Sequence, residues 1–476
     1  MANKRKKTSS SSSLVTEASV CEAFVRRFHN DYRYVVTYSR FVMKTGRAWD
    51  LCREMDAYHQ VYASVLKLCK EMSVDDPDVG KRIQSNRFVK NCLEMLQNDE
   101  RIRVNDAQFH TNPEELVTKS GIVCLRTGAL LPEPENGVPP SVGWIDYDYE
   151  PNPPDPVRFL AFLQEMFQGN SAQIEYLQTL LGYCLTGYSR EEKLPVFYGV
   201  GGNGKGTLFK VIHRVFSQYA IVMDASTLDR PQGGPSPELT RIREKRLILI
   251  HELSPNSFSS SALIKSLTGG DAIATRGLYQ DTEEFIPRAT LMVSCNTLPS
   301  IKNYGHDWER RIEPFPCESI PATPDVKLKD AMVAECGGVL HWVIEGAKRY
   351  LATGLPANPV REDAMPTFRE SVSLPAGWFS SCLRRGQEEE FVWNEDLRAS
   401  YRQYCTEQGY SGQVDTEVFT YLRRQGFKSD KKKGARGWYG LAILDPELDR
   451  EDVSILPPLL PLPMSPSLDR KDVPDK

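Results

Sequence analysis

The stretch Leu194–Phe216, LPVFYGVGGNGKGTLFKVIHRVF, decides the fold of this chain. It starts with apolar residues, continues as a glycine-rich loop and ends with apolar residues at helical spacing. The loop has the form G-x-x-x-x-G-K, with Gly199, Gly204 and Lys205 at the fixed positions. In such a loop, consecutive backbone N–H groups surround a phosphate, and the following helix directs its positive end at the same anion. The stretch therefore predicts a strand, a phosphate-binding loop, a helix and a nucleoside triphosphate between them.

The residues expected to hold this nucleotide, ATP, are those of the loop: Gly199, Gly201, Gly202, Asn203, Gly204, Lys205, Gly206 and Thr207. In ordinary loops of this type, the hydroxyl directly after the lysine ligates Mg²⁺. Here Gly206 follows the lysine, and the hydroxyl comes one place later, at Thr207. Two interpretations stay open: Thr207 contributes to a Mg²⁺ site, or it only caps the helix.

Composition and charge limit the class of protein. The chain has 476 residues, which predicts about two to four domains, and no apolar run is long enough to span a bilayer. The net charge of −4 argues against a general nucleic-acid coat, so nucleic-acid binding must use local basic patches. The 11 cysteines are scattered, which favours reduced thiols; Cys184 and Cys295 are expected in the core. We expect a cytoplasmic protein, in a bacterial host, without membrane contact.

The chain divides into parts by composition, and the expected class is α/β with a P-loop ATPase core. The parts are a basic, serine-rich and disordered tail at 1–16, a mixed α/β region at 17–155 that ends in a proline-rich stretch at 132–156, an alternating strand and helix domain at 156–355, a proline-containing joint at 356–376, a small basic domain at 377–445, and a proline-rich, disordered tail at 446–476. Within the second part, helical periodicity predicts helices around Tyr58–Met72 and Arg87–Leu96.

Polar side chains follow two further apolar strands. Leu247–Ile250 is followed by His251 and Glu252, and the apolar run ending at Ser294 is followed by Asn296. A carboxylate at such a strand end can hold Mg²⁺ or orient the attacking water, and an amide can sense the γ-phosphate. The alternatives are an ordinary exposed acid and, for the amide, a simple turn.

Three groups of basic residues are candidates for contacts with phosphates. The adjacent Arg310 and Arg311 could stabilise a transferring phosphoryl group from a neighbouring subunit, or form surface ion pairs with Glu309 or Glu313. Around a Gly-Gly-Asp turn, Lys265, Arg276 and Tyr279 could contact a single DNA strand, or belong to a solvated loop.

The third group lies near the C-terminus, where the pattern predicts two helices and a β-hairpin, the order of a winged helix. The last helix and the hairpin carry seven basic residues: Arg423, Arg424, Lys428, Lys431, Lys432, Lys433 and Arg436. Such clustering in a near-neutral protein indicates binding to the DNA backbone, with a solvated charged loop as the alternative.

The order of these motifs resembles that of the superfamily 3 helicases. More narrowly, it resembles the phage and plasmid primase-helicase family, which includes the poxvirus primase-helicase. The segments that carry the resemblance are GVGGNGKGT, LILIHE, IKSLTGGDAIATRGLYQDTEEFIP, LMVSCN and WERRIEPF, with SGIVCLRTGALLPEP and LQTLLGYCLTGY ahead of them. The resemblance covers residues 110–320 well and 30–110 weakly.

The resemblance implies an AAA+-like ATPase that assembles as a ring, usually a homo-hexamer, and unwinds DNA during replication of a phage, plasmid or related mobile element. Lys205 would bind ATP, Glu252 would be the catalytic acid and Asn296 the sensor. Arg310 or Arg311 would reach into the next subunit, with Arg311 slightly favoured. Lys265 and Arg276 fall in the family's DNA-translocation segment.

Other functions remain open on the sequence alone. A P-loop ATPase could load or remodel proteins on DNA without unwinding it, and an initiator could use ATP only for assembly. A metabolic kinase is disfavoured by the arginine pair and the basic C-terminal part. Too few residues precede the helicase-like region for a primase domain, so we expect no priming activity here and a separate primase as partner.

Overall fold

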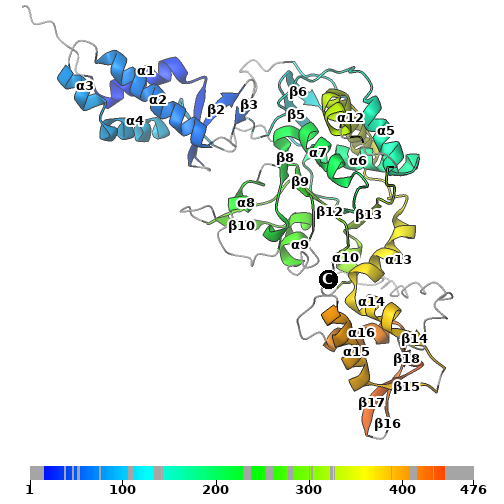
Figure 1. Cartoon of the computed structure of the whole chain (residues 1–476). Coiled ribbons are helices and arrows are strands. Elements are labelled where there is room, and N and C mark those ends of the chain that lie inside the picture. Colours follow the sequence, from blue (N-terminus) through cyan, green and yellow to red (C-terminus); the bar gives the residue numbers. More distant parts are fainter. Residues whose placement is uncertain are drawn as a thin grey trace, which may run out of the picture.

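The computed structural model describes most of the chain, and Figure 1 shows it as three successive parts. The described residues are 15–36, 39–45, 48–50, 54–73, 77–105, 112–132, 141, 143–228, 237–243, 245–253, 261–276, 282–299, 301, 304–321, 325, 327–387, 389–407, 415–432 and 434–444. Tyr279, Lys433 and the two predicted tails except residues 15 and 16 lie outside them, as does the side chain of Arg276. In the described part of the chain, no helix is long and apolar enough to cross a membrane.

The N-terminal part has its own core of helices against a small sheet. Helices α1 (Glu17–Phe28), α2 (Glu54–Met72), α3 (Pro77–Ile83) and α4 (Asn86–Asn98) accompany a sheet of order β3-β2-β1-β4, formed by Ala48–Asp50, Arg40–Thr45, Tyr32–Val35 and Arg103–Val104. Thr16 and Ser85 start α1 and α4 as caps, since each hydroxyl accepts a backbone N–H of the first turn. The two helices predicted here are confirmed as α2 and α4.

The central part is built on a five-stranded sheet in which all neighbouring strands run parallel. Its order is β13-β7-β12-β9-β8, formed by Ile312–Pro316, Leu194–Tyr198, Thr290–Cys295, Leu247–Ile250 and Ala220–Val222. The residues of β9 and β12 are all buried, because helices cover both faces of a parallel sheet. This explains why these strands read as continuous apolar runs in the sequence.

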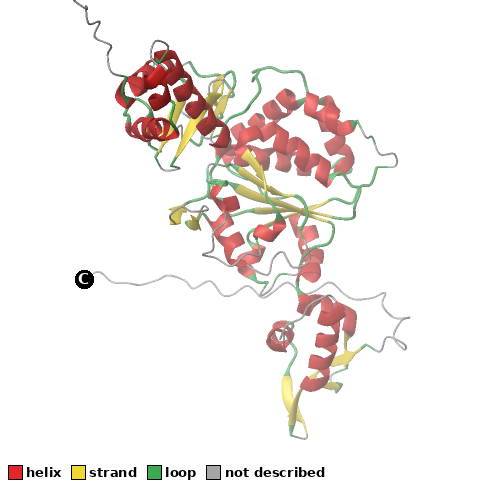
Figure 2. Cartoon of the chain, turned by 60° about the vertical axis from the view of Figure 1, so that its left-hand side comes forward, coloured by secondary structure: helices red, strands yellow, loops and turns green. Residues whose placement is uncertain are grey.

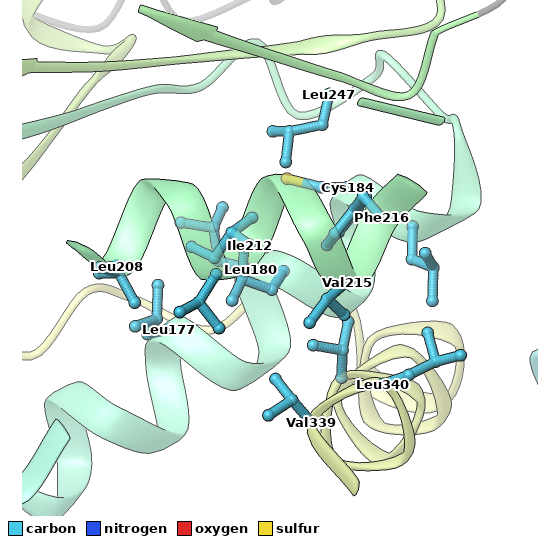
Figure 3. Packing of buried hydrophobic residues seen from close by; sticks show 14 of the residues in the cluster. Leu177, Leu180, Cys184, Leu208, Ile212, Val215, Phe216, Leu247, Val339 and Leu340 are labelled. Atoms are coloured by element: carbon cyan, nitrogen blue, oxygen red, sulfur yellow. The ribbon is translucent and has the colours of Figure 1, made fainter. Parts of the chain in front are cut away.

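Two apolar cores lie on the two faces of this sheet. Leu247 and Leu249 belong to one core, and Ile248 and Ile250 to the other, as the alternation along a strand requires. The first core lies under α5 (Val157–Met166), α6 (Ser171–Thr186), α7 (Lys205–Phe216), α11 (Leu328–Ala334) and α12 (Cys336–Thr353). Figure 3 shows side chains of α6, α7, α12 and β9 meeting in it.

Close packing of α6 against α12 depends on two glycines. A Cβ atom at Gly182 would lie 2.1 Å from the backbone nitrogen of Ala347, and one at Gly346 would lie 2.0 Å from the carbonyl oxygen of Gln178. Only glycine therefore permits this crossing.

The two cysteines expected in the core are buried there. Cys184, also on α6, is fully buried, and Cys295 on β12 is 1% exposed.

The second core lies under α9 (Ser261–Gly269), α10 (His306–Glu309) and α13 (Arg361–Val372). The hairpin of β10 (Ile273–Arg276) and β11 (Thr282–Phe285), next to α8 (Pro237–Thr240), extends from this side. Helix α13 occupies the region expected to be a proline-containing joint. It is instead part of the central unit, because Met365, Phe368 and Val372 are buried in this core.

The division expected near residue 155 also differs from the structure. The hairpin of β5 (Glu115–Thr118) and β6 (Gly121–Cys124) shares the first core with the parallel sheet, through Leu116 and Val123. The backbone N–H of Val117 donates to the hydroxyl of Tyr219 at 3.0 Å. This segment therefore belongs to the central unit, and sequence composition missed it because the contacts join residues about a hundred positions apart.

The C-terminal part contains α14 (Leu374–Cys382), α15 (Asn394–Glu407) and α16 (Asp415–Arg424). A sheet of order β15-β17-β16 packs beside them, formed by Phe391–Trp393, Ala435–Tyr439 and Ser429–Lys432. Strands β14 (Leu383–Arg385) and β18 (Leu441–Ile443) form a second pair. The predicted two helices and hairpin are present, and in both views the hairpin β16–β17 projects away from the rest of the described chain (Figures 1 and 2).

Candidate nucleotide-binding site

The glycine-rich loop follows β7 at the carboxyl edge of the sheet, and two of its glycines are sterically required. Gly199 has a φ of +139°, and a Cβ atom there would lie 2.2 Å from the carbonyl oxygen of Cys317. Gly204 has a φ of +87°, and its Cβ would lie 2.7 Å from the ring of Phe162. By contrast, a Cβ at Gly206 would meet nothing within 4 Å, so no steric contact requires glycine at this position.

Lys205 is the first residue of α7 and points into the loop. Its ammonium group donates to the carbonyl of Gly199 at 2.6 Å, to that of Val200 at 3.1 Å and to Oδ1 of Asn203 at 2.9 Å. The side chain is buried, and burial lowers the pKa of this lysine. Asn203 in turn donates to the carbonyl of Cys317, which follows β13. A bound phosphate would thus replace neutral carbonyl partners of the ammonium group with an anion.

The parallel strands bring Glu252 and Asn296 to the same edge as the loop. Glu252 follows β9, Asn296 follows β12, and both side chains are exposed. With Lys205 and Thr207 they line one cavity of about 450 Å³. The hydroxyl of Ser294 donates to the carbonyl of His251, which links the ends of the two strands. The three catalytic candidates from distant parts of the sequence therefore share one site.

Thr207 lies in the first turn of α7 but does not cap it. The N-cap of this helix is Gly204, without a side-chain hydrogen bond, so the capping interpretation fails. Thr207 and Glu252 both line the cavity, and their hydroxyl and carboxylate oxygens are suitable ligands for Mg²⁺. Gly201, Gly202 and Gly206 leave open space around their Cα atoms, which fits a polyphosphate against the loop. The donor set thus fits both ATP and Mg²⁺.

Sequence reasoning missed part of this cavity. Phe162 and Glu165 of α5 line it, as do Asp325 and Leu328 beyond β13. Asp325 forms an ion pair with Arg158 of α5, at 3.1 Å between Oδ2 and Nη2. No local motif marks these residues, because their position depends on how α5 packs over the loop.

Arg310 and Arg311 lie at the opposite edge of the sheet from the loop. They directly precede β13, and Glu192 precedes the neighbouring strand β7. Oε2 of Glu192 pairs with Arg310 and lies 3.4 Å from Nη2 of Arg311. The ion-pair alternative is thus present with a different acid, since Glu309 pairs with Arg369 and Glu313 with Lys193.

The two arginines differ in exposure. The side chain of Arg311 is 9% exposed, whereas that of Arg310 is 44% exposed. Nε of Arg311 donates to the hydroxyl of Thr268 at 3.1 Å, and its Nη1 donates to the carbonyl of Asp307 at 2.7 Å. Arg311 is therefore held by residues of its own chain, which argues against the slight sequence preference for it as the residue that reaches a neighbouring subunit.

The candidate DNA-binding residues of the central part are only partly described. Lys265 on α9 forms an ion pair with Asp307, and its Nζ lies 5.7 Å from the centre of the Trp308 ring. Arg276 is the last residue of β10, next to the hairpin tip, and Tyr279 falls outside the described residues. The structure therefore holds Lys265 against α10.

The basic residues of the C-terminal part lie at the surface. Six of them are described and all are exposed: Arg423, Arg424, Lys428, Lys431, Lys432 and Arg436. Lys431 and Arg436 are directly opposite each other in the β16–β17 ladder. Like charges at such a position are destabilising, which an anion between them would relieve.

The central part has a parallel sheet, a glycine-rich loop between β7 and α7, and polar residues at the same edge of the sheet. These features define a P-loop-like nucleotide-binding core.

Comparisons with known proteins agree. Residues 21–168 match the family model described as D5 N terminal like, and residues 197–311 match one described as a family of unknown function. With the viral relatives below, these matches confirm the resemblance of the chain to phage-type primase-helicases.

Two curated relatives are candidate helicases of viruses. The one from Acanthamoeba polyphaga mimivirus is 31% identical over 158 residues, which are 33% of this chain and 16% of the relative. The one from Invertebrate iridescent virus 6 is 29% identical over 187 residues, which are 37% of this chain and 19% of the relative. Among solved structures, the apo C-terminal region of NrS-1 has a TM-score of 0.49 at 11% identity, over 88% of this chain and 98% of that chain.

Proposed function

We propose that this protein is an ATP-dependent DNA helicase of superfamily 3 that acts in the replication of a phage, plasmid or related mobile element. One observation carries the proposal. Lys205, Glu252 and Asn296 come from three separate segments and line one cavity beside the glycine-rich loop. A phosphate-binding lysine, an acid and an amide in one cavity form the set that nucleotide hydrolysis requires. The names of the viral relatives favour a helicase over other users of ATP.

Each residue has a distinct role in this proposal. Lys205 and the loop N–H groups bind the phosphates of ATP, Glu252 takes a proton from the attacking water, and Asn296 orients that water. Thr207 and Glu252 would hold Mg²⁺, which when bound neutralises charge on the phosphates. Because Lys205 is buried, little solvent stabilises the charge of its ammonium group, and its pKa is lowered. The phosphates of bound ATP would stabilise this charge instead.

The position of the arginine pair supports a ring. The pair and the loop lie at opposite ends of strands of five residues, so about 16 Å of strand separates them. Arg310 therefore cannot reach the phosphates bound by its own loop. In a head-to-tail ring, for which we propose a homo-hexamer, the exposed Arg310 would instead reach the nucleotide of the next subunit.

DNA contacts are assigned to two regions. The exposed basic residues of α16 and the β16–β17 hairpin would bind the backbone, in a C-terminal part that we propose to be a winged helix. Lys265 and Arg276 would lie toward the DNA path of the ring, which requires that Lys265 leave Asp307. The chain spans less than a fifth of the length of these two viral relatives. A separate primase is proposed as a partner.

The test compares wild-type protein with Lys205→Ala. ATP hydrolysis is measured with and without single-stranded DNA, beside strand displacement on a forked duplex. Hydrolysis that DNA stimulates, together with unwinding, is expected in the wild type, and both should be lost in the variant. Stimulated hydrolysis without displacement would indicate a loader or remodeller instead, and hydrolysis indifferent to DNA would overturn the helicase proposal.

A further inference from the structure

The three-stranded sheet of the C-terminal part has two chemically different faces. Trp438 of β17 is 1% exposed, stacks on Phe419 of α16 at 5.9 Å between ring centres, and donates from Nε1 to Asn394 at 2.9 Å. Its partners in the ladder, Val392 and Ser429, lie on the same face. This face is the one that the helices cover.

The opposite face of the sheet carries three aromatic side chains. Because side chains alternate along a strand, Phe391, Trp393 and Tyr439 all point away from Trp438. All three are partly exposed, and none belongs to the apolar core of this part or packs against it. We call Phe391, Trp393 and Tyr439 the aromatic face. Packing in the apolar core therefore does not explain why these three positions carry large aromatic side chains.

Geometry holds the three rings as a group. The ring centre of Phe391 lies 4.9 Å from that of Trp393 and 4.8 Å from that of Tyr439. Phe391 also lies over Gly437, where a Cβ atom would approach its ring to 2.4 Å. The missing side chain at Gly437 lets the rings lie close to the sheet. Rings held in this way lose little side-chain entropy when a ligand stacks on them.

One cation lies on the aromatic face, and others lie on the other side of the same hairpin and on α16. Nζ of Lys432 lies 5.4 Å from the ring centre of Phe391, on the same side of the sheet. Lys431 and Arg436 project from the other side of the same hairpin, and Arg423 and Arg424 end the neighbouring α16. The acid on the aromatic side of the hairpin is Asp430, whose carboxylate accepts the backbone N–H of Lys431 at 2.7 Å. The charge complements a polyanion, and the rings complement its bases.

We propose that the aromatic face is a stacking site for the bases of single-stranded DNA, with the hairpin cations on the phosphates. Duplex DNA hides its bases in the stack, so it can use the cations but not the rings. The site thus makes the C-terminal part prefer an unpaired strand, such as one arm of a fork. The proposal rests on the proposed helicase function for its biological setting, but its test needs no hydrolysis.

The test measures binding of the full chain, without nucleotide, to three labelled oligomers of equal length: oligo(dT), an abasic strand and a duplex. Trp393→Leu keeps the apolar character and removes the ring. It should weaken oligo(dT) binding by about 5- to 150-fold, given about 1–3 kcal/mol per stacked base, and leave the abasic and duplex affinities within about 2-fold. Trp393→Phe should restore most of the loss, since a ring returns.

Two controls separate stacking from charge and from folding. Lys431→Ala should weaken binding to all three oligomers alike, because its contact is to phosphate. Tyr58→Leu removes an exposed aromatic of α2 and should change nothing. The thermal midpoint of Trp393→Leu should stay at the wild-type value.

A second measurement places the contact directly. Photocrosslinking with an oligomer that carries 5-iododeoxyuridine should give adducts on the aromatic face. Equal losses for oligo(dT) and duplex in Trp393→Leu, or unchanged oligo(dT) binding with adducts only elsewhere, would overturn the inference. Neither result bears on the helicase proposal, because that proposal depends on DNA-stimulated hydrolysis. Conversely, a protein without hydrolysis could still show the stacking result, because the binding test uses no nucleotide.

Discussion

Arg311 and Glu192 lie 3.4 Å apart between Nη2 and Oε2, and the same carboxylate oxygen also pairs with Arg310. One acid thus holds both arginines at the amino edge of the sheet. The hydrogen bonds of Arg311 to Thr268 and Asp307 hold it within its own chain, whereas Arg310 is exposed and, in the proposed ring, would face a neighbour. Replacement of Arg310 should therefore affect hydrolysis, whereas replacement of Arg311 should affect stability.

Arg310→Ala is expected to abolish most hydrolysis, and mixing should reveal why. When Arg310→Ala subunits are combined with Lys205→Ala subunits, roughly a quarter of the interfaces pair an intact loop with an intact Arg310. The mixture should regain hydrolysis although each variant alone has little or none. A mixture as inactive as its components would show that Arg310 does not act across an interface.

Arg311→Ala should primarily lower stability. Replacement leaves Thr268 and the carbonyl of Asp307 without their buried partner, at a cost of about 1–3 kcal/mol. Thermal unfolding of the two arginine variants provides the comparison, in which Arg310→Ala serves as the exposed control and should stay within about 0.5 kcal/mol of wild type. Equal stability of both variants would contradict the burial argument.

The pair Gly204→Ala and Gly206→Ala tests the loop geometry. Alanine at Gly204 would need a φ of +87° and would meet the Phe162 ring, so strain of about 1–3 kcal/mol and weaker ATP binding are expected. Alanine at Gly206 meets open space inside a helix, where it should be neutral or stabilise by about 0.5–1 kcal/mol. Nucleotide titration and thermal midpoints should separate the two variants clearly.

The open space at Gly206 also allows a test of the metal ligand. If Thr207 ligates Mg²⁺, Thr207→Ala should raise the Mg²⁺ concentration required for half-maximal hydrolysis. Adding Gly206→Ser to that variant should lower it again, because serine then follows the lysine directly as in ordinary loops. An unchanged Mg²⁺ requirement in Thr207→Ala would remove Thr207 from the site.

His213 of α7 should make the central part sensitive to acid. Burial and the nearby charges of His251, Lys245 and Arg214 lower the pKa of His213 below its usual 6.5. The unfolded chain then binds the proton more tightly, so the stability from neutral His213 is present above pH 6.5 and is lost as pH falls through the lowered pKa. Thermal midpoints between pH 7.5 and pH 5 should fall less in His213→Gln than in wild type. Parallel falls would contradict this assignment.

The sequence predicted those features that depend on interactions between residues close together in the chain. The stretch Leu194–Phe216 predicted its strand, loop and helix because a buried strand and an amphipathic helix leave their patterns in consecutive residues. The apolar runs before Glu252 and Asn296 predicted the other strands, and parallel strands end at one edge. The shared cavity therefore followed from local patterns and one topological rule.

The rest depended on contacts between distant residues. Composition placed a boundary near residue 155, whereas the β5–β6 hairpin packs into the central core. The choice between Arg310 and Arg311 needed the position of Glu192, and the aromatic face needed the register of β15 against β17. By itself the sequence determined which segments form strands, helices and the phosphate loop, because hydrophobic periodicity and glycine requirements are local. Only the tertiary structure decided which side chains are buried, paired or presented to a partner, because burial is set by packing between segments far apart in the chain.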